Sequence, residues 1–300
     1  MKRMQWTYSD ATALAVAYAD IFDYPLTEEE LIRWMPFKKF IHHLTADGAA
    51  YYSLRSVRGL IAVRKKRAAW SSGKWIRAAR IARLLRVIPT IRLVGVTGGL
   101  AMNNAKQEDD IDLFFVVSSG TLWATRFLVT IIVEIFGIRR KPADTTFADK
   151  ICLNMFMSER ALALPQKERD MFAAHEVLQM VPLWERDGTY RKFLRANQWV
   201  KDFLPNAWEE KCRMLNVEYR MKRSKKRENL FGIWHLAFGI LEPLARVVQL
   251  WYMKKRRTNE IVSGSVIRFH PRDARVWVKQ ALARRLGRLN IPLDKIFYGR

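Results

Sequence analysis

The chain has 300 residues, of which half are hydrophobic and 12% are aromatic; this excludes general disorder and is enough for two or three compact units. Lys and Arg number 53 against 29 Asp and Glu, so the formal net charge is +24 and the sequence pI is near 10.4. That excess predicts salt-sensitive association with a polyanion, either nucleic acid or an anionic membrane surface. Cys152 and Cys212 give no disulfide framework and no Cys/His metal spacing, and the N-terminus has no apolar signal region. We therefore expect a cytoplasmic protein, with peripheral attachment to a membrane as an alternative.

Residues 1–63 are predicted to form a small helical unit. Apolar residues recur at helical spacing from Ala11 to Phe22, and a proline soon afterwards ends that helix. Thr27 followed three residues later by Glu30 is a capping box, which predicts the start of a second helix. A third helix is expected over residues 37–44.

Two short β-prone runs, residues 50–54 and 60–63, predict a hairpin after these helices. Three helices followed by a basic hairpin resemble a winged helix-turn-helix, in which the third helix enters a groove of duplex DNA. The candidate recognition helix has no Asn, Gln or Arg to read base edges, so a winged helix used for packing or protein contact is the alternative. Its basic and titratable residues are Lys38, Lys39, His42 and His43.

Residues 64–90 are predicted to form a basic connecting helix. From Arg64 to Arg92 the chain carries ten basic residues and no acidic one, with apolar residues at roughly helical spacing among them. A charge run of this kind is usually a solvated face. The absence of acidic partners within the segment favours contact with a polyanion.

The chemistry-bearing stretch of the chain begins with the apolar strand predicted over residues 91–96. A turn at Gly98-Gly99 follows, and a second apolar run then carries Asp110 and Asp112. Alternation along a strand places both carboxylates on one face, where they repel each other and require compensation by cations. A divalent metal shared with substrate phosphates would supply it, and the glycine turn allows a polyanion to approach the backbone closely.

The diglycine, ten intervening residues and Asp110-Ile111-Asp112 between hydrophobic flanks resemble the signature of the DNA polymerase β-like nucleotidyltransferase superfamily. The resemblance covers about 20 residues. It implies a mixed-sheet catalytic core, two Mg²⁺ ions and a nucleoside triphosphate donor. Gly98 and Gly99 would then contact the triphosphate, and Asp110 and Asp112 would hold the metals. Many members have a serine where this chain has Gly99, so one phosphate-contacting hydroxyl is absent.

The superfamily usually has a third carboxylate on a later strand, predicted here over residues 150–157. Cys152, Asn154 and Phe156 would share one face of that strand, and Asn154 occupies the position expected to be acidic. An amide oxygen can bind a metal but brings no charge, which weakens the expected general base. Asp144 and Asp149 are nearby alternatives.

The remaining segments are expected to be mostly helical. Residues 121–137 predict a helix packed behind the catalytic sheet, and residues 159–300 a helical C-terminal region in which Pro182 ends a helix. His175 lies among apolar residues and is interpreted as a hydrogen-bonded core residue rather than a base. The apolar run over residues 230–253 suits a buried helical hairpin; the alternatives are an interfacial helix and a transmembrane segment.

The sequence therefore predicts an α+β protein in which a nucleotidyltransferase mixed sheet, residues 91–158, is flanked by an N-terminal winged helix and a helical C-terminal region. The expected activity is Mg²⁺-dependent transfer of a nucleotidyl group from an NTP to a hydroxyl acceptor, with release of pyrophosphate. The alternative is a non-catalytic nucleic-acid-binding or regulatory protein that retains the fold. Expected partners are the NTP, DNA or RNA, and an anionic membrane surface through residues 220–257.

Overall fold

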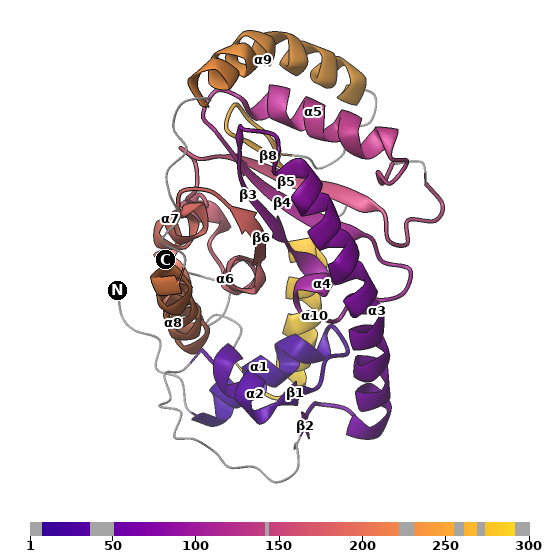
Figure 1. The fold of residues 1–300 in the computed structure, drawn as a ribbon. Helices are drawn as coiled ribbons and strands as arrows, with labels where there is room; N and C mark the ends of the chain where they lie inside the picture. The colour runs from indigo at the N-terminus through magenta and orange to yellow at the C-terminus, as the bar shows by residue number, and fades with distance from the viewer. Residues whose placement is uncertain are drawn as a thin grey trace.

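The computed structural model describes residues 8–36, 51–141, 144–221, 231–254, 261–268 and 274–291. Its centre is a mixed sheet of six strands in the order β6-β3-β4-β5-β8-β7 (Figure 1). β4 and β5 are parallel, and the other neighbouring strands are antiparallel. The strands are β3 (Ile91–Val96), β4 (Ile111–Val117), β5 (Ile151–Ser158), β6 (Val181–Glu185), β7 (Ile261–Val262) and β8 (Val266–Arg268).

Helices cover both faces of this sheet, so the predicted α+β class is confirmed. A separate small sheet pairs β1 (Leu26–Thr27) with β2 (Tyr51–Tyr52). The α-helices are α1 (Tyr8–Asp20), α2 (Glu28–Trp34), α3 (Val57–Leu85), α4 (Gly98–Ala101), α5 (Leu122–Ile135), α6 (Met171–Gln179), α7 (Thr189–Ala196), α8 (Pro205–Met221), α9 (Phe231–Met253) and α10 (Ala274–Arg288), and two 3₁₀ helices are η1 (Gln166–Glu168) and η2 (Gln198–Asp202).

Alternation along β4 divides the core into two layers. Ile111, Leu113 and Phe115 are fully buried against residues of α3, α5 and α9. Phe114 and Val116 face the opposite way, toward residues of α1, α6, α7 and α10. Because side chains alternate along a strand, Asp112 lies on the same face as Phe114 and Val116. This is the face of the sheet that α6 covers.

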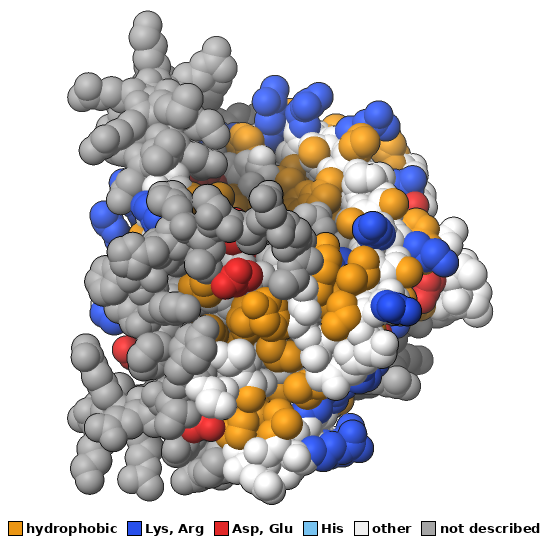
Figure 2. Space-filling model, turned by 90° about the horizontal axis from the view of Figure 1, so that it is seen from below, with side chains coloured by type: hydrophobic (Ala, Val, Ile, Leu, Met, Phe, Trp, Pro, Cys, Tyr) orange, Lys and Arg blue, Asp and Glu red, His pale blue; other side chains and the backbone are white. Residues whose placement is uncertain are grey.

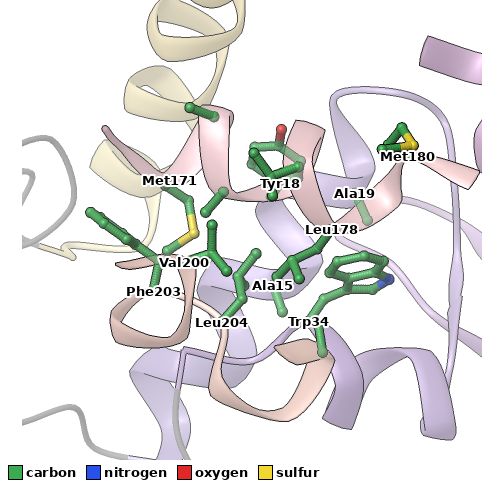
Figure 3. Close-up of a cluster of buried hydrophobic side chains, with 14 of the residues drawn as sticks. Ala15, Tyr18, Ala19, Trp34, Met171, Leu178, Met180, Val200, Phe203 and Leu204 are labelled. Carbon is green, nitrogen blue, oxygen red and sulfur yellow. The ribbon is translucent and has the colours of Figure 1, made fainter. Parts of the chain in front are cut away.

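The N-terminal helices share one core with segments from the second half of the chain. In Figure 3, Tyr18 of α1 and Trp34 of α2 lie among side chains of α6 and of η2 and the residues after it, including Leu178 and Leu204. The predicted capping box is confirmed: Thr27 Oγ1 accepts from Glu30 N at 3.3 Å, and Glu30 Oε2 accepts from Thr27 N at 2.9 Å. Residue 63, the predicted end of the N-terminal unit, lies inside α3.

The predicted wing hairpin is wrong in its second strand. Residues 60–63 belong to the first turns of α3, and β2 pairs instead with β1. A single glycine inside a helix costs only about 1 kcal/mol, so Gly59 does not end it. The Arg64 guanidinium fixes this turn of helix by donating to Glu30 Oε2 at 2.6 Å and Oε1 at 2.8 Å. The predicted recognition helix, residues 37–44, lies outside the described residues.

Several basic residues of α3 have acidic partners from other parts of the fold. Arg67 pairs with Asp23 at 3.0 Å and Lys74 with Asp149 at 2.9 Å. The segment itself contains no acid, because these partners lie far away along the chain. Lys and Arg side chains are nevertheless spread over the described surface seen from below (Figure 2).

The prediction of a helical C-terminal region is wrong in part. Three strands of that region, β6, β7 and β8, complete the two edges of the sheet. Pro182 does not end a helix: α6 ends at Gln179, and Pro182 lies opposite Gly95 within β6. Proline has no N–H for a ladder hydrogen bond, and an edge strand tolerates it because only one side of the strand is paired.

The predicted buried helical hairpin over residues 230–253 is also wrong. The segment forms one helix, α9, with Pro243 inside it. Glu242 accepts from the backbone N–H groups of Trp123 and Ala124 at 2.9 and 2.8 Å, so this charge within the apolar run caps α5. Gln249 Nε2 donates to Trp123 O at 2.8 Å and also joins the two helices. Within the part of the chain that the structure describes, no helix is long and apolar enough to cross a membrane.

Candidate active site

The glycine turn and the acidic strand meet at Gly98. Thr97 is extended at the end of β3, and Gly98 then adopts φ +67°, a left-handed conformation that favours glycine. A Cβ added at Gly98 would lie 2.8 Å from Asp112 Oδ2. Both the backbone angle and the carboxylate therefore require glycine here.

Gly99 is under no such constraint. A Cβ built there would approach Asn104 O at 3.5 Å, an ordinary contact, and its φ is not positive. The two glycines open α4, so their amide N–H groups have no acceptor inside that helix. They are available to an anionic ligand, and a serine would fit at position 99.

Asp110 and Asp112 converge as the strand alternation predicts. Asp112 lies opposite Cys152 in the parallel β4–β5 pair. One carboxylate oxygen from each aspartate and the Cys152 sulfur all lie within 4.8 Å of one another. The resulting cluster of two acids and a thiol stands beside Gly98.

Charge in the cluster is only partly compensated. Arg140 Nη1 donates to Asp110 Oδ2 at 2.6 Å and lies 4.0 Å from Cys152 Sγ. Burial, together with the negative charge of Asp110, raises the pKa of Asp112 well above that of an ordinary aspartate. Burial also raises the pKa of the Cys152 thiol, and the two carboxylates add to this shift. A cation beside Asp112 would relieve both shifts.

The donor set fits a hard divalent cation better than a soft one. Carboxylate oxygens are the ligands that Mg²⁺ prefers, whereas a thiol binds metals as the thiolate and suits softer ions. The Cys152 sulfur would bind a metal only as the thiolate, and the raised pKa of the thiol opposes its ionisation as long as no cation lies beside it. Asp110 and Asp112 are thus the residues that would hold such an ion.

Asn154 lies on the site face with Cys152, as strand alternation predicts. A bulge follows directly: the pairing shifts between Asp112–Cys152 and Phe114–Met155, so that Leu153 and Asn154 together lie opposite Leu113. Its Nδ2 lies 3.5 Å from Thr97 Oγ1, while its buried Oδ1 has no hydrogen-bond partner among the described residues. The prediction that Phe156 shares this face is wrong: beyond the bulge, Phe156 stacks on Phe115 in the opposite layer.

Glu176 is the acidic residue that sequence reasoning missed as a candidate. It lines a cavity of about 90 Å³ with Thr97 and Asn154, between the sheet and α6. Burial raises its pKa to about 7, against the lowering effects of Arg275 and Arg268, which line the same cavity. The charge of Glu176 also contributes to raising the pKa of Asp112, so the two acids are within electrostatic reach. A third carboxylate therefore approaches from a helix and not from a strand.

Asp144 and Asp149, the alternatives predicted for a third carboxylate, form ion pairs away from the site. Asp144 pairs with Lys150 at 2.9 Å, and Asp149 pairs with Lys74 at the same distance. Neither belongs to the cluster around Asp112 or lines the cavity. Their ion pairs hold the segment that leads into β5.

His175 is a core residue, which confirms its interpretation. Its ring stacks on Tyr18 with 3.8 Å between ring centroids and an interplanar angle of 6°, and burial lowers its pKa to about 3. It has no contact with the acidic cluster that would make it a base there. Because α6 turns 100° per residue, His175 enters the core while its neighbour Glu176 faces the cavity.

Comparison with known proteins adds no family assignment. No protein-family model matches the chain, and no curated protein matches it.

Proposed function

We propose that the protein is a Mg²⁺-dependent nucleotidyltransferase that moves a nucleotidyl group from an NTP to a hydroxyl acceptor and releases pyrophosphate. The observation that carries the proposal is the contact between the glycine turn and the acidic strand. Asp112 Oδ2 approaches Gly98 so closely that a Cβ there would clash with it, and Asp110 lies beside Asp112. A phosphate cradle and a carboxylate pair in one place suit phosphoryl-transfer chemistry. The sequence resemblance to polymerase β-like nucleotidyltransferases points the same way.

The glycine turn and Arg140 are assigned to binding and charge balance. The N–H groups of Gly98 and Gly99 donate to oxygens of the triphosphate. Asp110 and Asp112 would hold Mg²⁺, which when bound would neutralise phosphate charge and make the acceptor hydroxyl more acidic. Arg140 orients Asp110 and balances its charge through their 2.6 Å hydrogen bond.

Glu176 is assigned to the acceptor side. Its carboxylate takes the proton of the acceptor hydroxyl while the new bond from the acceptor oxygen to the α-phosphorus forms and the bond to pyrophosphate breaks. A pKa of about 7 suits a group that must accept a proton near neutral pH. The cavity that Glu176 shares with Asn154 and Thr97 gives the acceptor a place on the same side of the sheet as Asp112.

The proposal is tested by incubating the protein with each α-labelled NTP and Mg²⁺ or Mn²⁺ in a cell extract and asking what becomes labelled. We expect one nucleotide to label one class of acceptor, with stoichiometric release of pyrophosphate. Asp110→Asn and Asp112→Asn should abolish labelling, whereas Asp149→Asn, outside the site, should retain it. Equal labelling by all three variants would contradict the assignment.

A further inference from the structure

The outer surface of α9 carries a long row of exposed apolar side chains. α9 packs on α5 through Phe238, Ala245 and Met253 and lies outside α5 at one end of the molecule (Figure 1). On its other side, Ile240 is 70% exposed and Trp251 is 77% exposed. We call this row and its continuation on α5 the apolar face; it consists of Leu236, Ile240, Leu241, Leu244, Val247, Val248, Trp251 and Tyr252 of α9, and Phe127, Ile131, Ile135 and Phe136 along α5 and at its C-cap.

A basic cavity adjoins the C-terminal end of this face. It has a volume of about 510 Å³ and is lined by Trp123, Arg246, Leu250, Trp251, Lys254, Val262 and Ser263. Its two charged lining residues are cations, Arg246 and Lys254, and both are exposed. Neither makes an ion pair with an acid in the described parts of the chain, so their charge is free to act on a ligand.

Trp123 lines the cavity and has a buried hydrogen-bond donor. The residue is 2% exposed, and its indole Nε1 has no hydrogen-bond partner among the described residues. A buried N–H normally finds an acceptor, because leaving it unpaired is unfavourable. A ligand with phosphate oxygens would pair the two cations, and one that reached the indole would satisfy this donor as well.

We propose that this end of the molecule is a membrane-surface site, in which Arg246 and Lys254 bind the headgroup phosphate of an anionic phospholipid and the apolar face enters the acyl-chain boundary. Exposed apolar helix surface next to Lys and Arg is the pattern of helices that lie in a bilayer interface. Trp251 stands where the two surfaces meet, as tryptophans do at the headgroup level. In sequence, Lys255, Arg256 and Arg257 follow Lys254 directly and extend the basic run.

An anionic bilayer suits this surface better than a second copy or a nucleic acid. A two-fold dimer through α9 would bring two copies of Arg246 and Lys254 together without acids to pair them, since Glu242 is already engaged with α5. A nucleic acid would use the cations but leave the apolar face in water. Only a lipid surface offers phosphate and hydrocarbon side by side.

The test is flotation of the full-length protein with vesicles of phosphatidylcholine alone or mixed with phosphatidylglycerol, at physiological ionic strength. We expect flotation with the mixed vesicles only. Arg246→Glu with Lys254→Glu should weaken binding by about 30-fold or more. The control, Lys65→Glu with Lys66→Glu, makes the same charge change on exposed residues near the start of α3, at the other end of the molecule, and should bind nearly as well as the wild type.

A second pair of variants separates apolar insertion from charge. Trp251→Ala should weaken binding by about tenfold, and Trp70→Ala, a tryptophan that is 36% exposed on α3, should leave it unchanged. Circular dichroism and thermal unfolding identify any variant that has lost its fold. Equal losses of vesicle binding from the two double charge reversals, or from the two tryptophan variants, would overturn the proposal. They would show that the protein is attracted to the vesicles without a specific site. Failure of the wild type to float, combined with self-association that Trp251→Ala abolishes, would show that α9 binds a second copy instead.

Discussion

Gly98 and Gly99 are adjacent but face different constraints, which makes them a matched pair for mutation. Gly98→Ala must accept a positive φ and a Cβ 2.8 Å from Asp112 Oδ2, so we expect a loss of about 2–4 kcal/mol in the free energy of unfolding and no nucleotide transfer. Gly99→Ser has room for its side chain and should fold as the wild type does. Urea unfolding of both variants checks this. Equal destabilisation would mean that Asp112 does not limit the space at Gly98.

Glu176 should make the protein less stable as the pH rises. Its pKa is about 7 in the folded protein against 4.5 for an ordinary glutamate, so the unfolded chain releases this proton first. The stability that the protonated form provides is fully present below pH 4.5 and is lost between pH 4.5 and 7. Glu176→Gln should therefore match the wild type near pH 4 and exceed it by up to about 3 kcal/mol near pH 8.

Chemical unfolding of Glu176→Gln and the wild type across this pH range measures the effect. The pH dependence of stability that His175 contributes has the opposite sign. The pKa of His175 is lowered to about 3, so its contribution to stability is lost as the pH falls below 6.5. A constant difference between Glu176→Gln and the wild type at every pH would show that folding does not raise the pKa of Glu176. If the variant also kept full transfer activity, Glu176 would not be the base.

At the scale of elements, Lys74 ties α3 to the segments that lead into the two site strands. Its buried Nζ donates to Gln107 O at 3.1 Å, Asp109 O at 2.5 Å and Asp149 Oδ1 at 2.9 Å. Lys74→Met should cost about 2–4 kcal/mol of unfolding free energy, because three acceptors lose a charged donor that is itself buried. Arg77→Met, on the same helix, removes a half-exposed pair with Asp149 at 3.5 Å and should cost less than about 1 kcal/mol. Similar losses in urea unfolding would show that Lys74 contributes only as surface charge.

Glu242 of α9 joins the two helices by capping the N-terminus of α5. Glu242→Ala removes the acceptor for two backbone N–H groups at the start of α5, and we expect a loss of about 1–2 kcal/mol. Hydrogen exchange should quicken at Trp123 and Ala124 while β4 stays protected. Faster exchange throughout the sheet would indicate that α9 supports the whole core and not this helix end alone.

For the molecule as a whole, the sequence predicted the elements whose signals are local. β3 and β5 follow from short apolar runs with strand spacing, and the start of α2 follows from the Thr27–Glu30 capping box. The convergence of Asp112 with the glycine turn was also predicted, because both lie within one strand-turn-strand unit.

What the sequence could not predict depends on contacts between distant segments. Pro182 looked like a helix terminator and lies in an edge strand, since only the assembled sheet determines which strand is at the edge. The basic helix seemed to lack acidic partners because Asp23 and Asp149 reach it from other elements. Glu176 gave no signal of its own, as it enters the site only when α6 packs on the face that carries Asp112.

The most direct test of the account measures transfer of label from an α-labelled NTP by wild-type protein and by Asp112→Asn, with Mg²⁺ present and folding verified by circular dichroism. The account predicts that the variant keeps its fold and loses transfer by about 1,000-fold, on the order of 4 kcal/mol in the barrier. Transfer by a folded Asp112→Asn at the wild-type rate would contradict it.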